Sequence, residues 1–366
     1  MYLVTNRNLK REQGGIEIFE SQLNRKGANE LRLVEVTGPM NNLRAKALTD
    51  KLSTSRVQQL QAQFNLDIDP SQPYYASLEV ACELFQRARK ECKHLLLYVH
   101  GYNNNVKDVV QTARELEKTY PDVIVLPFTW PAKGGGAVSG TANYIDDKRD
   151  ARTSEGALDR VFEIFREFHA LLVEGQSAEL WVRAKRKHPQ NHERAREEFV
   201  RLQNRICQVS VNLLAHSMGC YVLKHATVPT NARIRKLVFD NVVLVAPDTN
   251  NHDHSSWLSA IESRNGTYVT INEDDFALQW SRRKPGEEQR ARLGHYLKGL
   301  NTPSATYVDV TSASYVRDSH SYFHGQPVLK NSKLRRLFSD LFTGESPQLK
   351  STRLRYYPEV NAYRLP

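Results

Sequence analysis

The stretch VNLLAHSMGCYVLKHA, residues 211–226, joins a continuous apolar run to a segment with helical spacing through the pentapeptide AHSMG. A serine at such a junction is typical of a nucleophile elbow, a sharp turn that lifts the hydroxyl above the end of a strand. Small residues are needed two positions before and after the serine, and here they are Ala215 and Gly219. The pattern therefore predicts that Ser217 is a nucleophile, and a serine that caps a helix is the plainer alternative.

Apolar runs and amphipathic segments alternate on both sides of this stretch. Buried strands are predicted at 95–99, 122–131, 237–247 and 305–312 and in QVSVNLLA and GTYVTINE, and helices at 75–93, 106–120 and 154–175 and in MGCYVLKHA and SSWLSAIES. Three shorter β-like runs, YLVTNR, GIEIFES and ELRLVEVTG, predict antiparallel strands at the N-terminus. This order indicates an α/β fold with a doubly wound, mostly parallel sheet. Residues 43–70 show no clear period, and KGGGAVSGTANY is predicted to be a flexible loop.

The chain has 366 residues and a formal charge of +10, and much of the excess charge lies in two segments. Residues 183–205 carry eight Lys or Arg against three Glu, and residues 330–355 carry seven against two acidic residues. Neither segment interleaves aromatic residues in the way that a single-strand-binding surface does, and no nucleic-acid-binding signature accompanies them. A solvated basic face is therefore favoured over a nucleic-acid site. The predicted organisation is a hydrolase domain at 1–330, with a charged helical insertion at 176–205 that we interpret as a lid, and a basic C-terminal extension at 331–366.

The N-terminal apolar run is too short for a secretory signal, and no uncharged apolar stretch approaches the length that spans a bilayer. A cytoplasmic location is therefore predicted. The four cysteines have no CxxC spacing, so buried free thiols are favoured over a zinc site or a disulfide framework. They are Cys82, Cys92, Cys207 and Cys220.

Two loops carry candidate donors for an oxyanion hole. Acyl transfer builds negative charge on a carbonyl oxygen, and each preorganised N–H group aimed at that oxygen is worth about 3 kcal/mol. The backbone amides of Met218, directly after the serine, and Tyr102, in HGYNNN after the strand at 95–99, are the predicted donors. His100 in the same motif is predicted to be an architectural hydrogen-bonding residue.

A serine hydroxyl needs a histidine to remove its proton, and that histidine needs a carboxylate to fix its tautomer. In the hydrolase order of Ser, acid and His, the strand YVTINE leads to Glu273, Asp274 and Asp275, and RDSHSYFHG supplies the histidine. Asp275 is favoured as the acid, Asp248 in VAPDTNN is the alternative, and only geometry separates Asp275 from Asp274. His320 is the predicted base, and His324 follows four residues later.

These motifs resemble the α/β-hydrolase superfamily, in particular an uncharacterised bacterial branch of serine hydrolases. The matching pieces, spread over residues 94–324, are YVHGYNNN, FTWPA, LLAHSMG, LVAPD, DDFAL and DSHSYF. The resemblance implies Ser217 as nucleophile, Asp275 as acid and His320 as base, with no assigned substrate.

The sequence thus predicts a serine hydrolase that cleaves carboxylic esters, small-molecule or lipid, through an acyl-enzyme intermediate and without a cofactor. Two alternatives stay open: a lipase or phospholipase in peripheral contact with anionic membranes, and a hydrolase fold kept as a binding module. His252, Asp253 and His254 form an HDH cluster, for which an exposed polar loop is favoured over a metal site. Nucleic acid is not favoured as a partner, and the oligomeric state is left open.

Overall fold

The structure is a computed structural model that describes residues 1–366 except 135–139, 228–238, 283–290, 351 and 366; the side chains of 140–143 are not described either. The chain divides into two compact units. The first contains residues 1–47, 94–160 and 210–366, and the second contains 48–93 and 161–209.

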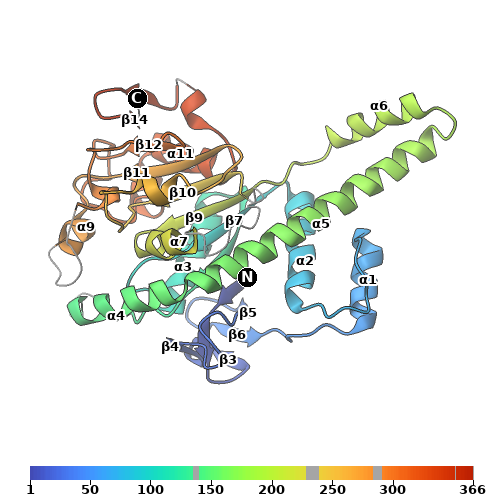
Figure 1. Cartoon of the computed structure of the whole chain (residues 1–366), viewed down its shortest axis with the longest axis horizontal. Helices are drawn as coiled ribbons and strands as arrows, with labels where there is room; N and C mark the ends of the chain where they lie inside the picture. Colours follow the sequence, from blue (N-terminus) through green and yellow to red (C-terminus); the bar gives the residue numbers. More distant parts are fainter. Residues whose placement is uncertain (135–139, 228–238, 283–290, 351, 366) are drawn as a thin grey trace. The chain divides into compact units, whose positions relative to one another are not determined.

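The first unit is built on a sheet that has twelve strands among the described residues (Figure 1). In spatial order they are β13 (Arg355–Tyr357), β14 (Ala362–Arg364), β12 (Ala305–Asp309), β11 (Gly266–Ile271), β10 (Asn241–Val245), β9 (Val211–His216), β7 (His94–Val99), β8 (Val123–Thr129), β1 (Tyr2–Thr5), β5 (Arg32–Thr37), β6 (Arg44–Ala47) and β3 (Gln13–Gly15).

The centre of this sheet is parallel and its flanks are antiparallel. All neighbours from β12 through β8 pair in parallel, as do β1 with β8 and β12 with β14, whereas β5, β6, β3 and β13 pair antiparallel. The chain runs from β7 outward to β8, then returns to β9 on the other side of β7 and continues to β10, β11 and β12. The prediction of a mostly parallel sheet with antiparallel N-terminal strands is therefore confirmed. Ligands bind such sheets where the order reverses, which here is between β7 and β9.

Helices α3 (Val106–Thr119) and α11 (Ser332–Phe342) share one buried apolar cluster with alternate residues of the central strands. Helix α3 begins with a capping box, in which Asn105 and Asp108 bond each other's backbone amides. The first unit also contains α4 (Gly140–Thr153), the start of α5 (Glu155–Lys187), α7 (Met218–Thr227), α8 (Ser255–Leu258), α9 (Phe276–Ser281) and α10 (Gln326–Lys330). Residues 331–366, predicted to be an extension, supply α11, β13 and β14 to this unit.

Four sequence predictions differ locally from the structure. Part of GIEIFES is a short 3₁₀ helix (Ile16–Ile18), and the next strand, β4 (Phe19–Leu23), pairs with β2 (Arg7–Leu9) in a separate two-stranded sheet. The unassigned stretch 43–70 contains β6 and a helix, α1 (Thr54–Phe64). The predicted glycine-rich loop is helical from Gly140 on, and its residues 135–139 lie outside the described part. The strand predicted at 237–247 begins at Asn241, and 237–238 lie outside the described residues.

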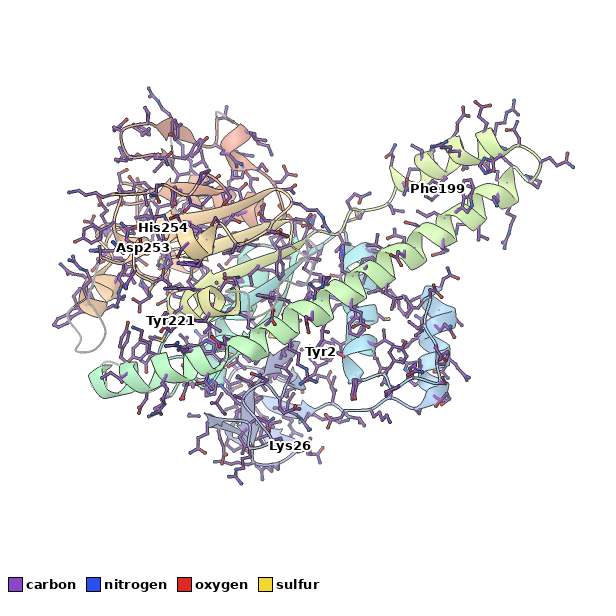
Figure 2. The ribbon with its side chains drawn as sticks, in the orientation of Figure 1. Tyr2, Lys26, Phe199, Tyr221, Asp253 and His254 are labelled. Atoms are coloured by element: carbon purple, nitrogen blue, oxygen red, sulfur yellow. A yellow bond between two sulfur atoms is a disulfide. The ribbon has the colours of Figure 1, made fainter. Side chains whose placement is uncertain are left out.

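The second unit is helical. Helices α1, α2 (Ala76–Glu91) and α5 supply its apolar core, which includes Leu60, Leu78, Phe85, Phe168 and Leu172. Ser53 caps α1 by accepting a hydrogen bond from the Arg56 amide. Helix α6 (His192–Gln203) follows and carries Phe199 (Figure 2). The Phe199 ring packs edge-to-face against Trp181 of α5, with ring centroids 5.6 Å apart. The predicted insertion 176–205 lies within this unit, and its action as a lid stays a prediction.

A disulfide joins Cys92, which ends α2, to Cys207 within the second unit. The expectation of free thiols is therefore wrong for these two residues, because the fold brings together positions that are 115 residues apart in the chain. Cys82 and Cys220 are free and buried, as predicted. Disulfides persist mainly in oxidising compartments. The cytoplasmic location stays a prediction, and this bond weighs against it.

Among the described residues, no helix is both long and apolar enough to cross a membrane.

Candidate active site

Ser217 lies at a sharp turn between β9 and α7, at the carboxyl end of the sheet's central strands. Its φ angle is 53°, in the left-handed region that a residue with a side chain rarely adopts. The turn is held because the Ser217 amide donates to the Val245 carbonyl at 3.0 Å and the Asp248 amide donates to the Ser217 carbonyl at 3.2 Å. The local geometry is that of a nucleophile elbow.

Gly219 allows the helix after Ser217 to approach the neighbouring strand. A Cβ added at Gly219 would lie 2.5 Å from the Val99 carbonyl oxygen and 2.6 Å from that of His100. These atoms belong to the end of β7 and the residue after it, and they cannot move as a flexible side chain can. Ala215, where a glycine is usual, is fully buried in β9 and its methyl group is accommodated.

We expect Gly219→Ala to destabilise the first unit by about 1–3 kcal/mol, because the added methyl group overpacks the elbow against two backbone carbonyls. Urea denaturation monitored by circular dichroism measures this change. Gly15→Ala is the matched control, because its added Cβ meets only the end of the Glu17 side chain. Equal stability of the two variants would contradict the close approach.

His320 is bound to Asp275 beside the elbow. Its Nδ1 donates to Asp275 Oδ2 at 2.7 Å, and its ring centroid lies 4.7 Å from that of His216, the residue before Ser217. Asp275 is fully buried, and its other oxygen, Oδ1, accepts from the Leu278 amide at 3.0 Å as the N-cap of α9. A carboxylate in this position is stabilised as an anion by the helix terminus. Burial alone would lower the pKa of His320, but the charge and hydrogen bond of Asp275 raise it above its ordinary value.

The alternative acid, Asp248, is bound to other groups. Its oxygens accept from Ser281 Oγ at 2.6 Å and from Tyr144 Oη at 3.0 Å, and the Arg292 guanidinium lies 3.1 Å away. The Asp248 and Arg292 side chains are only 4% and 3% exposed, so this is a buried ion pair. Thus Asp275, and not Asp248, contacts the ring nitrogen of His320. Asp274 is exposed, and Glu273 accepts a hydrogen bond from the Leu297 amide.

The loop that carries His320 is fixed from two sides. The Asn272 side-chain amide donates to the carbonyls of Arg317 and Ser319, at 2.9 and 3.0 Å. On the other side, Nε2 of His216 lies 3.2 Å from the His320 carbonyl oxygen. Burial holds the pKa of His216 well below its ordinary value, so the ring stays neutral and donates to this carbonyl. His216 thereby connects the elbow to the loop of the predicted base.

The HGYNNN loop also lies next to Ser217. A Cβ added at Gly101 would lie 2.8 Å from the Ser217 Cβ, so only glycine lets this loop come so near the serine. The Asn104 side-chain amide donates to the carbonyls of Gly101 at 3.2 Å and Tyr102 at 2.8 Å. Met218, the second predicted oxyanion donor, is the first residue of α7 and is buried. The two predicted donors thus lie on segments that approach the serine from β7 and β9.

Two buried charged side chains hold this loop in place, and neither was predicted from the sequence. Arg7 donates to the carbonyls of Asn104 and Ala132, each at 3.0 Å, and Asp147 accepts from the amides of Asn103 at 3.3 Å and Lys133 at 3.0 Å. Burial lowers the pKa of Arg7 to about 9 and raises that of Asp147 to about 6. Arg7 lies in a short polar strand and Asp147 in the charged run DDKRD, so neither has a sequence signal.

His100 has the structural hydrogen-bonding role that the sequence predicts. It is fully buried and stacks on Trp130, with ring centroids 5.0 Å apart. Its Nε2 accepts from the Trp130 amide at 3.2 Å, and Nδ1 lies 2.8 Å from the Gly101 carbonyl. Burial lowers the pKa of His100 to about 3, so the ring is neutral. It ties the end of β8 to the start of the HGYNNN loop.

The remaining histidine predictions have simple outcomes. In the HDH cluster, of which Figure 2 labels Asp253 and His254, His252 is exposed and pairs with Asp253. His254 is buried and lies 2.6 Å from both the Asn251 carbonyl and Tyr307 Oη, which corrects its predicted exposure. The described residues contain no group of acidic, His and Cys side chains that could hold a metal ion. His324 pairs with Glu115 at 3.0 Å.

A mostly parallel sheet with an elbow serine at its reversal point and a His–Asp pair beside it has the architecture of an α/β hydrolase. Over residues 78–172 and 183–336, more than half of the chain, the sequence matches DUF900, a family described as an alpha/beta hydrolase of unknown function. The chain belongs to this family and is an α/β hydrolase. No curated protein and no solved structure matches it.

Proposed function

We propose that this hydrolase is a serine esterase that cleaves carboxylic esters with Ser217 as nucleophile, His320 as base and Asp275 as acid. The hydrogen bond between His320 Nδ1 and the buried Asp275 carboxylate, next to the elbow, carries the proposal. Because Nδ1 holds its proton toward Asp275, the neutral ring leaves the lone pair of Nε2 to accept the proton of the serine.

In the proposed reaction Ser217 Oγ attacks the ester carbonyl while Nε2 of His320 takes the hydroxyl proton. The amides of Tyr102 and Met218 stabilise the negative charge on the carbonyl oxygen. The imidazolium then protonates the leaving alkoxide, and an acyl-enzyme remains. Water, deprotonated by the same histidine, releases the acid and restores the serine. Every step uses groups of this chain and the substrate, without a cofactor.

A fluorophosphonate probe tests this proposal, because it phosphonylates a serine only where a base and an oxyanion hole activate it. We expect one labelled residue, identified by peptide mass spectrometry as Ser217. Failure to label the folded protein, or labelling that maps elsewhere, would refute the assignment and favour the binding-module alternative. A panel of p-nitrophenyl esters of increasing chain length then defines the acyl group.

A lipase is a second candidate, and one surface feature favours it. Phe276 and Trp280, on the helix that begins directly after Asp275, are 56% and 48% exposed, and their rings pack edge-to-face with centroids 6.0 Å apart. An exposed aromatic pair next to the proposed acid is suited to contact an acyl chain or a lipid surface. We propose that this pair selects apolar ester substrates.

The double change Phe276→Ser and Trp280→Ser is expected to lower kcat/KM for long-chain esters and lipid vesicles at least about tenfold, since two exposed aromatic side chains can no longer bury apolar surface of the substrate. Hydrolysis of the acetate ester should change little. Leu349→Ser, which removes an exposed apolar side chain elsewhere, is the control. Equal losses on acetate and on long-chain esters would contradict a part in substrate selection.

A further inference from the structure

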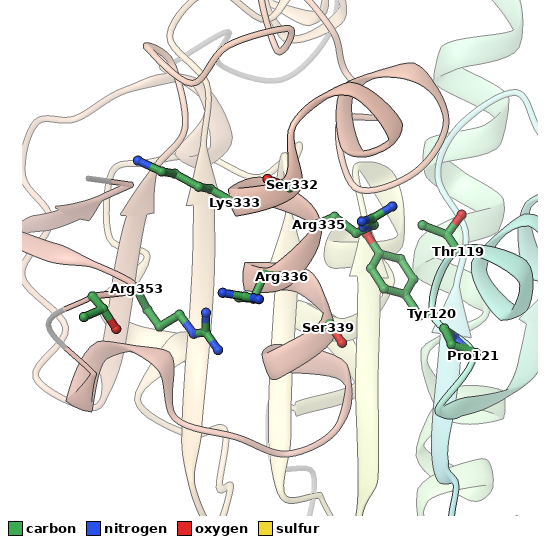
Figure 3. A pocket seen from close by; sticks show the side chains of 10 residues that line it. Thr119, Tyr120, Pro121, Ser332, Lys333, Arg335, Arg336, Ser339 and Arg353 are labelled. Atoms are coloured by element: carbon green, nitrogen blue, oxygen red, sulfur yellow. The ribbon is translucent and has the colours of Figure 1, made fainter.

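A basic hollow of about 600 Å³ lies on the first unit, and none of its lining residues belongs to the candidate active site (Figure 3). Its walls come from the end of α3, the outer face of α11 and the segment before β13. The lining residues are Thr119, Tyr120, Pro121, Ser332, Lys333, Arg335, Arg336, Ser339, Thr352 and Arg353. Four of the ten are cations, and none is a carboxylate.

The amphipathic pattern of α11 explains how these cations are presented. Leu334, Leu337 and Phe338 on one side of the helix are buried in the core of the sheet. Arg335 and Arg336 therefore lie on the opposite, exposed side. The core contacts hold the helix in place, so the positions of both arginines are fixed by packing and not by their own interactions.

Among the described residues, the positive charges of this hollow are only partly balanced. Arg353 pairs with Asp340, with Nε and Oδ2 3.0 Å apart, but Arg335 and Arg336 have no ion-pair partner in the described part of the chain. Figure 3 shows the side chains of Arg336 and Arg353 directed toward one another across the hollow. Like charges that converge in this way repel, and an anion between them would turn the repulsion into attraction.

We propose that this hollow binds a phosphate group. The planar guanidinium matches the geometry of phosphate oxygens and can bind two of them at once, and Arg336 and Arg353 supply two such groups. Arg335 lies on the Tyr120 side of the same hollow and adds positive charge (Figure 3). The hydroxyls of Ser332 and Ser339 on the same face of α11 are further donors. Tyr120 is only 1% exposed, so no aromatic face is free to stack a base, and a phosphate carried by a small molecule or a lipid headgroup fits better than nucleic acid.

Calorimetric titration with pyrophosphate tests the proposal independently of the esterase assignment. The double variant Arg335→Gln and Arg336→Gln is expected to bind pyrophosphate at least about tenfold more weakly than the native chain, with p-nitrophenyl acetate hydrolysis unchanged. Arg194→Gln with Arg196→Gln, two exposed arginines on α6, removes the same charge elsewhere and should bind like the native chain. Unchanged circular dichroism and melting temperature verify that the variants are folded.

Co-sedimentation with phosphatidylcholine vesicles, with and without phosphatidic acid, distinguishes the two sources of phosphate. Sedimentation that requires phosphatidic acid and is lost in the Arg335/Arg336 variant identifies a lipid headgroup as the ligand. Pyrophosphate binding without sedimentation on vesicles identifies a soluble ligand. Either result supports the site. If the native chain neither binds pyrophosphate nor sediments with phosphatidic acid, the proposed site is overturned. An equal loss of binding in the α6 control also overturns it, because the affinity would then come from net charge alone.

Discussion

Replacing Ser217 by alanine is expected to lower kcat for ester hydrolysis by about 10⁴ to 10⁶-fold and to abolish fluorophosphonate labelling. The change removes only the hydroxyl of Ser217, which is 4% exposed. Because backbone hydrogen bonds hold this turn, the fold should persist. His320→Gln is expected to give a loss of similar size, because without the base the serine keeps its proton. Stopped assays with p-nitrophenyl acetate and gel-based labelling measure both effects.

The double variant Ser217→Ala with His320→Gln provides the internal check. If the two residues act as one unit, its rate should be about equal to that of either single variant, and not the product of the two losses. His324→Gln is the matched histidine control, since its ring is bound to Glu115 and not to Asp275. A Ser217→Ala protein that retained native activity would rule out the proposed nucleophile.

Asp275→Asn is expected to reduce kcat by about 10⁴-fold while leaving stability nearly unchanged at a pH where His320 is neutral. Asparagine is as good an N-cap as aspartate and can keep the hydrogen bond from the Leu278 amide. It cannot hold the Nδ1 proton of His320 as a carboxylate does. Asp248→Asn is the contrasting variant, because it leaves the buried Arg292 charge unpaired. We expect it to lower the free energy of unfolding by about 3–5 kcal/mol and to reduce kcat less than Asp275→Asn does. Ester assays and urea denaturation on both variants separate the two acids.

The pH profile of the Asp275→Asn variant adds an independent readout. Because Asp275 raises the pKa of His320 above its ordinary value of 6.5, native activity should fall as the pH drops through a value above 6.5. In the variant, burial lowers the pKa of His320 and only the smaller effect of the Asp248 charge opposes it, so the acid limb of the residual activity should move to lower pH. The raised pKa also means that the protonated pair adds stability below pH 6.5, which is lost as the pH rises through the folded-state pKa. An unmoved acid limb would contradict this pairing.

Local sequence patterns were sufficient for the central sheet and its helices. Strands such as β8, β9 and β10 are buried at every residue, so they appear in the sequence as unbroken apolar runs. Helix α1 was missed, because most of its eleven residues are polar and only Val57 and Leu60 are fully buried. Its helical state depends on packing within the second unit, which no local window contains.

Within the candidate site, the sequence indicated which residue types follow which strands but could not rank the acids. Asp248, Asp274 and Asp275 all follow buried strands within loops of similar composition. Their separation depends on tertiary contacts: an Arg292 ion pair for Asp248, exposure for Asp274 and the imidazole of His320 for Asp275. No local sequence pattern identified Arg7 and Asp147, the two buried side chains that hold the HGYNNN loop.

The sequence by itself determined the α/β class, which reactive residues follow which strands, and the elbow at Ser217. Each of these depends on the spacing of apolar residues or on residues within a few positions of one another. Only the tertiary structure decided which carboxylate meets His320, which cysteines pair and which arginines converge on the basic hollow. These outcomes depend on side chains from 17 to 115 residues apart, and distances between such residues are set by the packing of the whole core and not by neighbours in the chain.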